Sequence, residues 1–258
     1  MVASVLVIEK LRQPGGPGSE IKRCAASVCY MHPMRLSGKH VAVTGASSGL
    51  GRAIAHAFAK EGAAVSGFAR RFKSGATKPG PGEVSELPLD VTDEAAVKTR
   101  MAEMPGLDIL VNCAGTGTFG SFEDMSVDDL RSMLDTHVVG AFLCAREALR
   151  KMHGAGHIVN VSSVAAFRTF SGCSGYTAAK EGLRGLTRVL TEEARTKNIR
   201  VTGLYPGAID TPIWDDRPGF DRKDMLAPES VAALVVDICC RPELSIEELL
   251  VLPPKGTL

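Results

Sequence analysis

The stretch "HVAVTGASSGLG", residues 40–51, decides the fold that this sequence predicts. It begins as a short apolar run rich in valine, continues through Gly45, Gly49 and Gly51, and opens a longer segment of helical periodicity. A buried strand that turns into a helix through closely spaced glycines brings backbone N–H groups and the positive end of a helix dipole to one point, where a phosphate can bind. A glycine-rich turn that only closes a strand onto a helix is the alternative interpretation.

Outward from this stretch, apolar runs alternate with segments of helical periodicity, which is the pattern of βαβ units around a parallel sheet. We therefore expect an α/β fold with a single doubly wound, parallel, seven-stranded sheet of the Rossmann-like type and helices on both faces. The expected strands cover residues 40–45, 63–69, 84–91, 107–115, 156–163, 199–207 and 246–253, and the expected helices cover residues 49–60, 93–104, 128–151, 174–197 and 228–239.

Two segments depart from this alternation. Residues 70–83, "RRFKSGATKPGPGE", stand where a crossover helix between the second and third strands would lie, but their glycines and prolines predict a shortened crossover. Residues 1–33 show no clear period, so we expect a disordered extension there and one domain over residues 34–258, with Met34 as a candidate natural start. A weakly basic targeting segment is the alternative for the extension.

Composition narrows the classes of function. The 258 residues carry a formal net charge of +1 and no long run of one sign, so nothing indicates a nucleic-acid or membrane-surface partner. Seven cysteines without small-domain spacing indicate reduced thiols in a cytoplasmic protein, and the spacing of Cys24, Cys29 and His32 matches no familiar metal site. No run approaches the roughly twenty apolar residues of a membrane-spanning helix, so we expect a small-molecule ligand.

The end of the second expected strand, "GFARR", bears on the choice of dinucleotide. Domains that prefer NAD usually place a carboxylate there to hold the ribose hydroxyls, whereas this chain has Arg70 and Arg71. Guanidinium groups suit a phosphate dianion, so we expect NADP(H) rather than NAD(H); two solvated arginines on a loop are the alternative. Asp90, at the end of the third strand, is placed to meet the adenine edge, while Thr92 or Asp93 is expected to cap the next helix.

A second motif, "GYTAAKEGL" at residues 175–183, places Tyr176 and Lys180 four positions apart among good helix formers. That spacing is about one helical turn, so both side chains should project from the same face. Taken alone, the spacing also fits an ordinary polar face. A phenol with a pKa of about 10 is a poor proton shuttle at neutral pH, but a neighbouring ammonium stabilises the phenolate and lowers that pKa.

Taken together, these motifs carry a family resemblance. From Met34 almost to its C-terminus the chain resembles the classical short-chain dehydrogenases/reductases, and in particular their 3-oxoacyl-carrier-protein-reductase-like, NADP-preferring members. The motifs occur in the family's order and on the expected elements: the glycine loop from Thr44 to Gly51, "NCAG" at residues 112–115, Ser163, Tyr176, Lys180, and "PGAIDT" at residues 206–211.

The resemblance implies a Tyr-Lys-Ser centre beside a nicotinamide. Tyr176 would act as proton donor or acceptor, Ser163 would hold the carbonyl oxygen, and Lys180 would assist Tyr176 and grip the ribose. Strand alternation sends only one of Ser162 and Ser163 to the site, and the family spacing selects Ser163. The implied cofactor-binding residues are Gly45, Ser47, Ser48, Gly49, Leu50, Gly51, Arg70, Arg71, Asp90, Val91, Asn112, Ala114, Gly115, Tyr176, Lys180, Pro206, Gly207, Ile209 and Thr211. Ile209 and Thr211 would meet the carboxamide.

The chain departs from the family pattern at two positions. His137 stands where the family usually carries an asparagine that completes a tetrad through a water, so an imidazole that holds this water and titrates near neutral pH is one interpretation. The other is that His137 only packs. Cys113 replaces the commoner second asparagine of "NNAG", which leaves open how that turn is held.

The substrate is the least determined part of the prediction. Residues 210–227 occupy the position of the family's substrate lid, where Trp214 and Phe220 are candidates to cover an apolar substrate, although the charges of this loop are equally consistent with a solvated surface. Phe167 and Phe170 either line the site or simply pack. Fold alone does not choose among substrates.

The leading hypothesis is an NADP(H)-dependent oxidoreductase that reduces a ketone or aldehyde, or oxidises the alcohol, by hydride transfer. A cofactor-binding regulatory or scaffold protein with vestigial activity is the alternative, and an epimerase or dehydratase usually needs a larger C-terminal region. We expect a small-molecule carbonyl or alcohol substrate, no metal, and a homodimer or homotetramer formed through the helices over residues 128–151 and 174–197.

Overall fold

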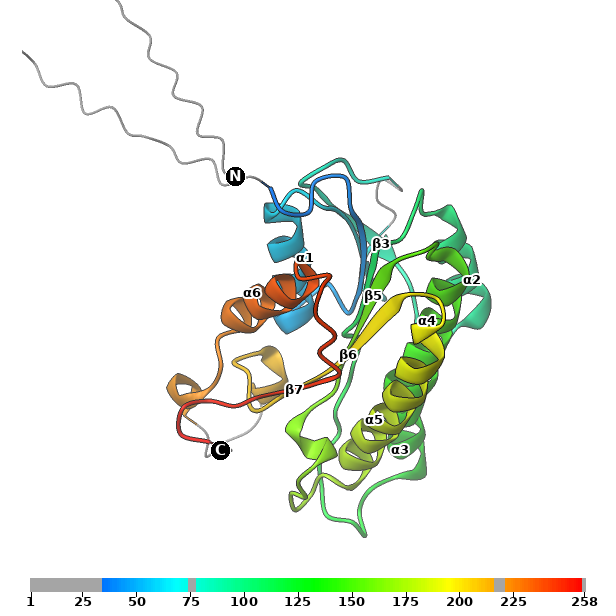
Figure 1. Cartoon of the computed structure of the whole chain (residues 1–258). Helices are drawn as coiled ribbons and strands as arrows, with labels where there is room; N and C mark the ends of the chain where they lie inside the picture. The colour runs from blue at the N-terminus through cyan, green and yellow to red at the C-terminus, as the bar shows by residue number, and fades with distance from the viewer. Residues whose placement is uncertain (1–33, 74–77, 216–220, 257–258) are drawn as a thin grey trace, which may run out of the picture. The chain divides into compact units, whose positions relative to one another are not determined.

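The computed structural model describes residues 34–73, 78–215 and 221–256, and its centre is one sheet of seven strands (Figure 1). The order of the strands is β3-β2-β1-β4-β5-β6-β7, and every neighbouring pair is parallel, so the predicted α/β fold is confirmed. The strands are β1 His40–Thr44, β2 Ala64–Ala69, β3 Val84–Pro88, β4 Ile109–Asn112, β5 Gly156–Val161, β6 Ile199–Pro206 and β7 Glu248–Val251.

Helices cover both faces of this sheet. Figure 1 shows α1 and α6 on one face and α2, α4 and α5 on the other. Because both faces of the sheet are covered, β2 and β4 are buried along their whole length, and their sequences consist mainly of small and apolar residues. The helices are α1 Gly49–Lys60, α2 Glu94–Glu103, α3 Val127–Leu134, α4 Gly140–Lys151, α5 Ser174–Arg195 and α6 Pro228–Cys239.

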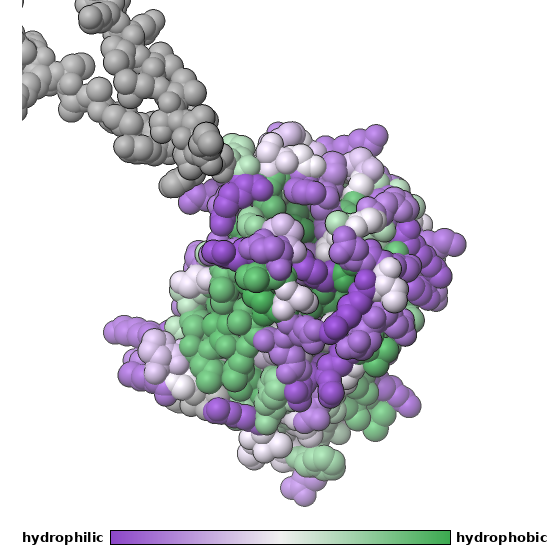
Figure 2. Space-filling model, in the orientation of Figure 1, coloured by the Kyte–Doolittle hydropathy of each residue, from purple (hydrophilic) through white to green (hydrophobic). Residues whose placement is uncertain are grey.

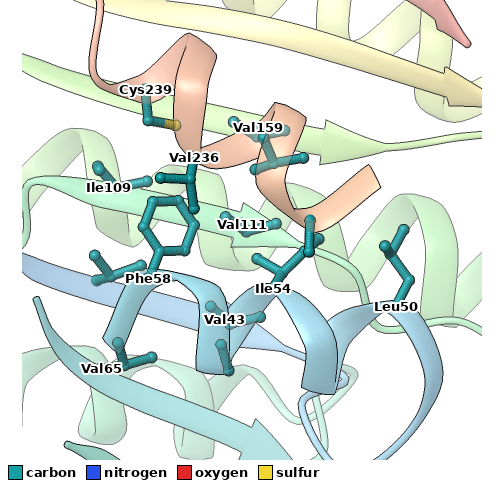
Figure 3. Packing of buried hydrophobic residues seen from close by; sticks show 14 of the residues in the cluster. Val43, Leu50, Ile54, Phe58, Val65, Ile109, Val111, Val159, Val236 and Cys239 are labelled. Carbon is teal, nitrogen blue, oxygen red and sulfur yellow. The ribbon is translucent and has the colours of Figure 1, made fainter. Parts of the chain in front are cut away.

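The first face of the sheet carries a tightly packed apolar core. Figure 3 shows Ile54 and Phe58 of α1 lying between the strands and Val236 of α6. Ile54 and Phe58 are fully buried, and burial of a side chain of this size contributes about 1.5–3 kcal/mol. Packing on this face holds α1, and therefore the glycine loop at its N-terminus, in one position against β1.

Two predicted elements differ from the structure, and a third, the shortened crossover, agrees with it. The single helix expected over residues 128–151 is interrupted by a π-helical turn, Asp135–Val139, in which the N–H of Gly140 donates to the carbonyl of Asp135. The third strand ends at Pro88, so Asp90 and Val91 lie in the loop that follows. The shortened crossover is confirmed, since residues 70–73 and 78–83, its described part, contain no helix.

Some predictions fall where the structure gives no test. The extension over residues 1–33, with Cys24, Cys29 and His32, lies outside the described residues, and the division into this extension and one domain over residues 34–258 stays a prediction. In residues 34–73, 78–215 and 221–256, no helix has both the length and the apolar character needed to cross a membrane. Figure 2 shows hydrophobic residues gathered over α6 and β7, with hydrophilic residues around them.

Candidate functional site

A cleft of about 1310 Å³ runs along the carboxyl ends of the strands. It crosses the point between β1 and β4 where the order of the sheet reverses, which is where open α/β sheets bind ligands. Of the predicted site residues, all except Asn112 line this cleft: Gly45, Ser47, Ser48, Gly49, Leu50, Gly51, Arg70, Arg71, Asp90, Val91, Ala114, Gly115, His137, Ser163, Tyr176, Lys180, Pro206, Gly207, Ile209 and Thr211.

The glycine loop between β1 and α1 is tightly folded against its neighbours. Gly45 has a φ of +72°, and a Cβ on it would lie 2.8 Å from the Cα of Ala114. A Cβ on Gly51 would overlap the carbonyl oxygen of Gly45. The loop therefore keeps its shape only with glycine at both positions, and that shape leaves its backbone facing the cleft.

The N-terminus of α1 is open to an anion. Ser48 is the N-cap residue but makes no side-chain capping bond, and the first turn of α1 holds no acidic residue. The hydroxyl of Ser48 instead accepts a hydrogen bond of 3.3 Å from Nη2 of Arg71. A helix dipole, unblocked N–H groups and a guanidinium thus converge at one end of the cleft.

Asp90 lies beside this positive end. Its carboxylate accepts hydrogen bonds from the N–H of Thr92 at 3.0 Å and from the hydroxyl of Thr92 at 2.8 Å. Burial acts to raise the pKa of Asp90, but the bonds from Thr92 and the charge of Arg70 outweigh it and leave that pKa below its usual value. The cap of α2 is Asp93, which accepts from the N–H of Ala96 at 3.0 Å. Asp90 is therefore an ionised residue that lines the cleft, and it is not the cap of α2.

A residue without an assigned role in the sequence analysis, Thr44, holds the turn after β4. Its Oγ1 accepts hydrogen bonds of 3.0 Å from the N–H of Cys113 and from that of Ala114. Thr44 is 1% exposed. The last residue of β1 thus holds the turn around Cys113. These two hydrogen bonds fix the turn although Cys113 replaces the second asparagine of the family's "NNAG".

Asn112 lies behind the wall of the cleft. Its amide nitrogen donates to Oδ1 of Asn160 at 2.9 Å, and the amide of Asn160 donates in turn to Thr187 on α5 at 2.9 Å. Asn112 is thus not among the residues that line the cleft, and its predicted role beside the cofactor stays a prediction. This buried chain of polar groups joins β4, β5 and α5 and sets the position of α5 relative to the sheet.

Tyr176 and Lys180 lie one turn apart on α5, and both face the cleft. Nζ of Lys180 lies 5.5 Å from the centre of the Tyr176 ring and donates to the carbonyl of Val161 at 3.1 Å. Burial lowers the pKa of Lys180 to about 8, with a smaller opposing effect from Cys113. An ammonium is thus kept close to the phenol in a site that contains no carboxylate partner for it among the described lining residues.

The two serines at the end of β5 point in different directions. The hydroxyl of Ser162 donates to the carbonyl of Lys180 at 3.0 Å and is buried against α5. Ser163 is half-buried, and its Oγ accepts a bond of 3.1 Å from the N–H of Ala165 in the short helical turn that follows. Ser163 lines the same cleft as Tyr176 and Lys180.

His137 lies in the π-helical turn and fills space beside the cleft. Its ring meets the Tyr176 ring edge-on, with 5.7 Å between the centres, and Nε2 lies 2.7 Å from the carbonyl oxygen of Thr116. Nδ1 is buried without a hydrogen-bond partner among the described residues. Burial, and then the charge of Lys180, lower the pKa of His137 to about 3, which favours the interpretation that His137 packs over the one in which it titrates near neutral pH.

The segment after β6 carries the last group of predicted contacts. The hydroxyl of Thr211 donates to the carbonyl of Ile209 at 3.3 Å. A Cβ on Gly49 would lie 3.1 Å from Cγ2 of Thr211, so this segment and the glycine loop face each other across the cleft. Arg222 forms ion pairs with Asp210 and Asp215, so these three charges of the loop are paired with one another.

Aromatic side chains gather in the part of the cleft beyond Tyr176. Phe119, which the sequence analysis missed, lies with its ring centre 5.4 Å from that of Tyr176. Phe170 and Trp214 also line the cleft, as considered from the sequence, whereas Phe220 lies outside the described residues. Phe167 does not line it; its ring packs edge-on against that of Tyr205, with 4.7 Å between the ring centres.

Comparison with known proteins gives consistent similarities. Residues 39–219 match the sequence model of the family described as short chain dehydrogenase. The chain is 33% identical over 240 residues to sepiapterin reductase of Chlorobaculum tepidum, covering 85% of this chain and 98% of that protein. It is 36% identical over 204 residues to a 3beta-hydroxysteroid dehydrogenase of Mediterraneibacter gnavus, covering 75% of this chain and 74% of that protein.

The fold is similar to that of solved structures as well. A short chain dehydrogenase from Burkholderia cenocepacia, in complex with NADP, superposes with a TM-score of 0.75 at 27% identity, over 85% of this chain and 98% of that one.

Proposed function

This chain belongs to the short-chain dehydrogenase/reductase family of oxidoreductases, and on that premise we propose that it reduces a ketone or aldehyde, or oxidises the alcohol, with NADP(H). The observation that carries the proposal is the arrangement of Tyr176 and Lys180, in which a buried ammonium lies 5.5 Å from the centre of a phenol ring on the same cleft as Ser163. A protein that only binds the cofactor has no use for a buried cation beside a phenol, because burial of that cation is unfavourable.

The residues of the cleft fit a dinucleotide with an additional phosphate. The glycine loop and the open N-terminus of α1 would hold the pyrophosphate, and Arg71, oriented by Ser48, would meet the 2′-phosphate with Arg70. The complex of the Burkholderia cenocepacia relative with NADP supports this choice over NAD(H). We propose contacts to the rest of the cofactor from Asp90, Val91, Ala114, Gly115, Tyr176, Lys180, Pro206, Gly207, Ile209 and Thr211.

When bound, NADPH supplies the hydride. Tyr176 donates a proton to the carbonyl oxygen of the substrate, and the hydroxyl of Ser163 donates a hydrogen bond to the same oxygen. Lys180 stabilises the phenolate that remains on Tyr176 after this transfer, because an opposite charge nearby favours the ionised form. Burial keeps His137 neutral, and its ring stands edge-on to Tyr176 with Nε2 2.7 Å from the carbonyl oxygen of Thr116, so His137 positions the phenol rather than exchanging its proton.

Two pairs of matched variants test this proposal. Tyr176→Phe should lower the rate of NADPH-dependent ketone reduction by about 10³-fold, far more than it changes the Kd for NADPH. Tyr205→Phe is its control, because Tyr205 is buried beside Glu248 and does not line the cleft. Ser163→Ala should lower the rate by about 10²-fold, with the buried Ser162→Ala as its control for loss of a serine hydroxyl. Full turnover by Tyr176→Phe would overturn the proposed role.

We also propose a homodimer or homotetramer in the cytoplasm. Phe142 of α4 and Val189 of α5 are 44% and 58% exposed, so both long helices present apolar side chains to a partner. Cys113, Cys144, Cys239 and Cys240 are free thiols, which supports a reducing compartment. Light scattering of the purified protein should give the mass of two or four chains, and a monomer at micromolar concentration would contradict the proposal.

A further inference from the structure

The part of the cleft formed by the loops after β4, β5 and β6, which we name the substrate half, is walled by apolar rings. Phe119 lies against Tyr176 with 5.4 Å between ring centres and an interplanar angle of 43°. A Cβ on Gly117 would lie 2.5 Å from the Phe119 ring and 3.4 Å from Cδ1 of Ile213, so both side chains rest on this glycine. Phe119 and Ile213 thus extend an apolar surface directly from the phenol.

The walls of the substrate half are joined to one another. The N–H of Gly120, after β4, donates to the carbonyl of Gly172, after β5, at 3.0 Å. Phe170 and Trp214 complete the lining from the loops after β5 and β6. A substrate whose carbonyl reaches the hydroxyl of Tyr176 therefore has its remaining atoms among aromatic and aliphatic side chains.

Among the described residues, the substrate half has no charged side chain available to a ligand. The charged residues that line the cleft are Arg70, Arg71, Asp90 and Lys180. The first three follow β2 and β3 at the opposite end of the cleft, and Lys180 is 5% exposed with its Nζ on the carbonyl of Val161. The other polar side chains are neutral, and beside Ser163 and Tyr176 they include Thr116, Thr136, Thr169, Ser171 and Cys173.

We infer that the substrate is an uncharged ketone or aldehyde that carries an apolar ring, and that carboxylates and phosphates of the same shape are rejected. The inference rests on the proposed function and specifies its substrate class. A ring packs against the Phe119 and Tyr176 rings, whereas an anion placed there loses its water and meets no available cation among the described lining residues.

A pair of cyclic ketones that differ in charge and by one methyl group tests this directly. Methyl 4-oxocyclohexanecarboxylate and 4-oxocyclohexanecarboxylate have the same ring, and the NADPH-dependent kcat/KM of the ester should exceed that of the acid by about 100-fold or more. Butanone, which lacks the ring, should be reduced with a kcat/KM at least about 10-fold below that of the ester.

A binding measurement separates this inference from the proposed chemistry. The chain contains one tryptophan, Trp214, and it lines the substrate half, so its fluorescence reports ligand binding there without turnover. Titration with the ester should give a Kd at least about 10-fold lower than titration with the acid.

A substitution should reverse the preference. Phe119→Lys introduces a cation beside Tyr176 and should raise kcat/KM for the acid by about 10-fold while lowering that for the ester. Phe122→Lys is the matched control, because Phe122 is 85% exposed and does not line the cleft, and it should change neither value. NADPH titration of both variants verifies that they are folded.

Each outcome decides one claim. An acid that is bound and reduced as well as the ester overturns the inference and leaves the proposed function intact. Tighter binding of the ester without reduction of any ketone supports the assignment of the substrate half and overturns the proposed function. Equal kcat/KM for butanone and the ester overturns the requirement for a ring.

Discussion

Replacement of Thr44 by valine should loosen the turn that forms the middle of the cleft. Valine has nearly the shape of threonine but cannot accept the two hydrogen bonds of 3.0 Å that Oγ1 receives from the N–H groups of Cys113 and Ala114. The substitution therefore leaves two donors without partners and changes little else, since Thr44 is 1% exposed.

The size of the effect follows from these two donors. An unsatisfied buried N–H costs about 1–3 kcal/mol, and the lower end applies because Cys113 and Ala114 are only half-buried. We expect the free energy of unfolding to fall by about 2 kcal/mol, which corresponds to a decrease in Tm of about 4–8 °C for a domain of this size. NADPH should also bind more weakly, because the turn is part of the proposed cofactor wall.

Urea unfolding followed by circular dichroism measures the first effect, and Thr44→Ser is the control. Serine keeps the acceptor and loses one methyl group, so it should cost only about 1 kcal/mol. A valine variant as stable as the serine variant would refute the argument that these hydrogen bonds hold the turn.

Three further perturbations test other parts of the account. Gly51→Ala should destabilise the protein by about 3 kcal/mol and abolish NADPH binding, because its Cβ would overlap a carbonyl oxygen of the loop. Gly185→Ala is the control: its Cβ would meet nothing within 4 Å, so this variant should stabilise α5 by up to about 1 kcal/mol. Thermal unfolding of both variants measures the two effects. Arg71→Ala should raise the Kd for NADPH, measured by calorimetry, by about 10- to 100-fold, and the Kd for NADH by less than about 3-fold. Arg131→Ala is the control and should change neither Kd. An equal change in both Kd values for Arg71→Ala, or any change for Arg131→Ala, would contradict the proposed contact of Arg71 with the phosphate. Lys180→Met should be more stable than the wild type at pH 7 by about 3 kcal/mol, because burial lowers the pKa of Lys180 from its ordinary value of 10.5 to about 8 in the folded protein. The cost of burying the charge is therefore fully present below pH 8 and disappears as the pH rises to 10.5. A difference in unfolding free energy that does not shrink over this range would show that Lys180 keeps its ordinary pKa.

The fold could be predicted from the sequence because each strand, helix and turn is marked by residues that are close together in the chain. Strands buried on both faces consist mainly of small and apolar residues, and the glycines after β1 mark the turn into α1. The π-helical turn at Asp135–Val139 could not be predicted, since one inserted residue leaves the apolar pattern on either side of it intact. That insertion decides how His137 is placed.

The candidate site was predictable only in part, because some of its contacts join residues that are far apart in the sequence. Tyr176 and Lys180 are neighbours on one helix, so their spacing reveals them. The bonds from Cys113 and Ala114 to Thr44 join residues about seventy positions apart, and the contact of Phe119 with Tyr176 joins two separate elements. No periodicity encodes such contacts. Phe167 and Phe170 look equivalent in the sequence, and only the turn after β5 separates the one that lines the cleft from the one that does not.

The central claim is that this cleft transfers a hydride to a carbonyl carbon, and isotope transfer tests it most directly. The wild-type protein would be incubated with methyl 4-oxocyclohexanecarboxylate and NADPH that carries two deuterium atoms at C4 of the nicotinamide. The account predicts an alcohol product that is one mass unit heavier, with the deuterium on the carbinol carbon and none of it exchanged with water. Formation of an alcohol without deuterium at that carbon would contradict the account.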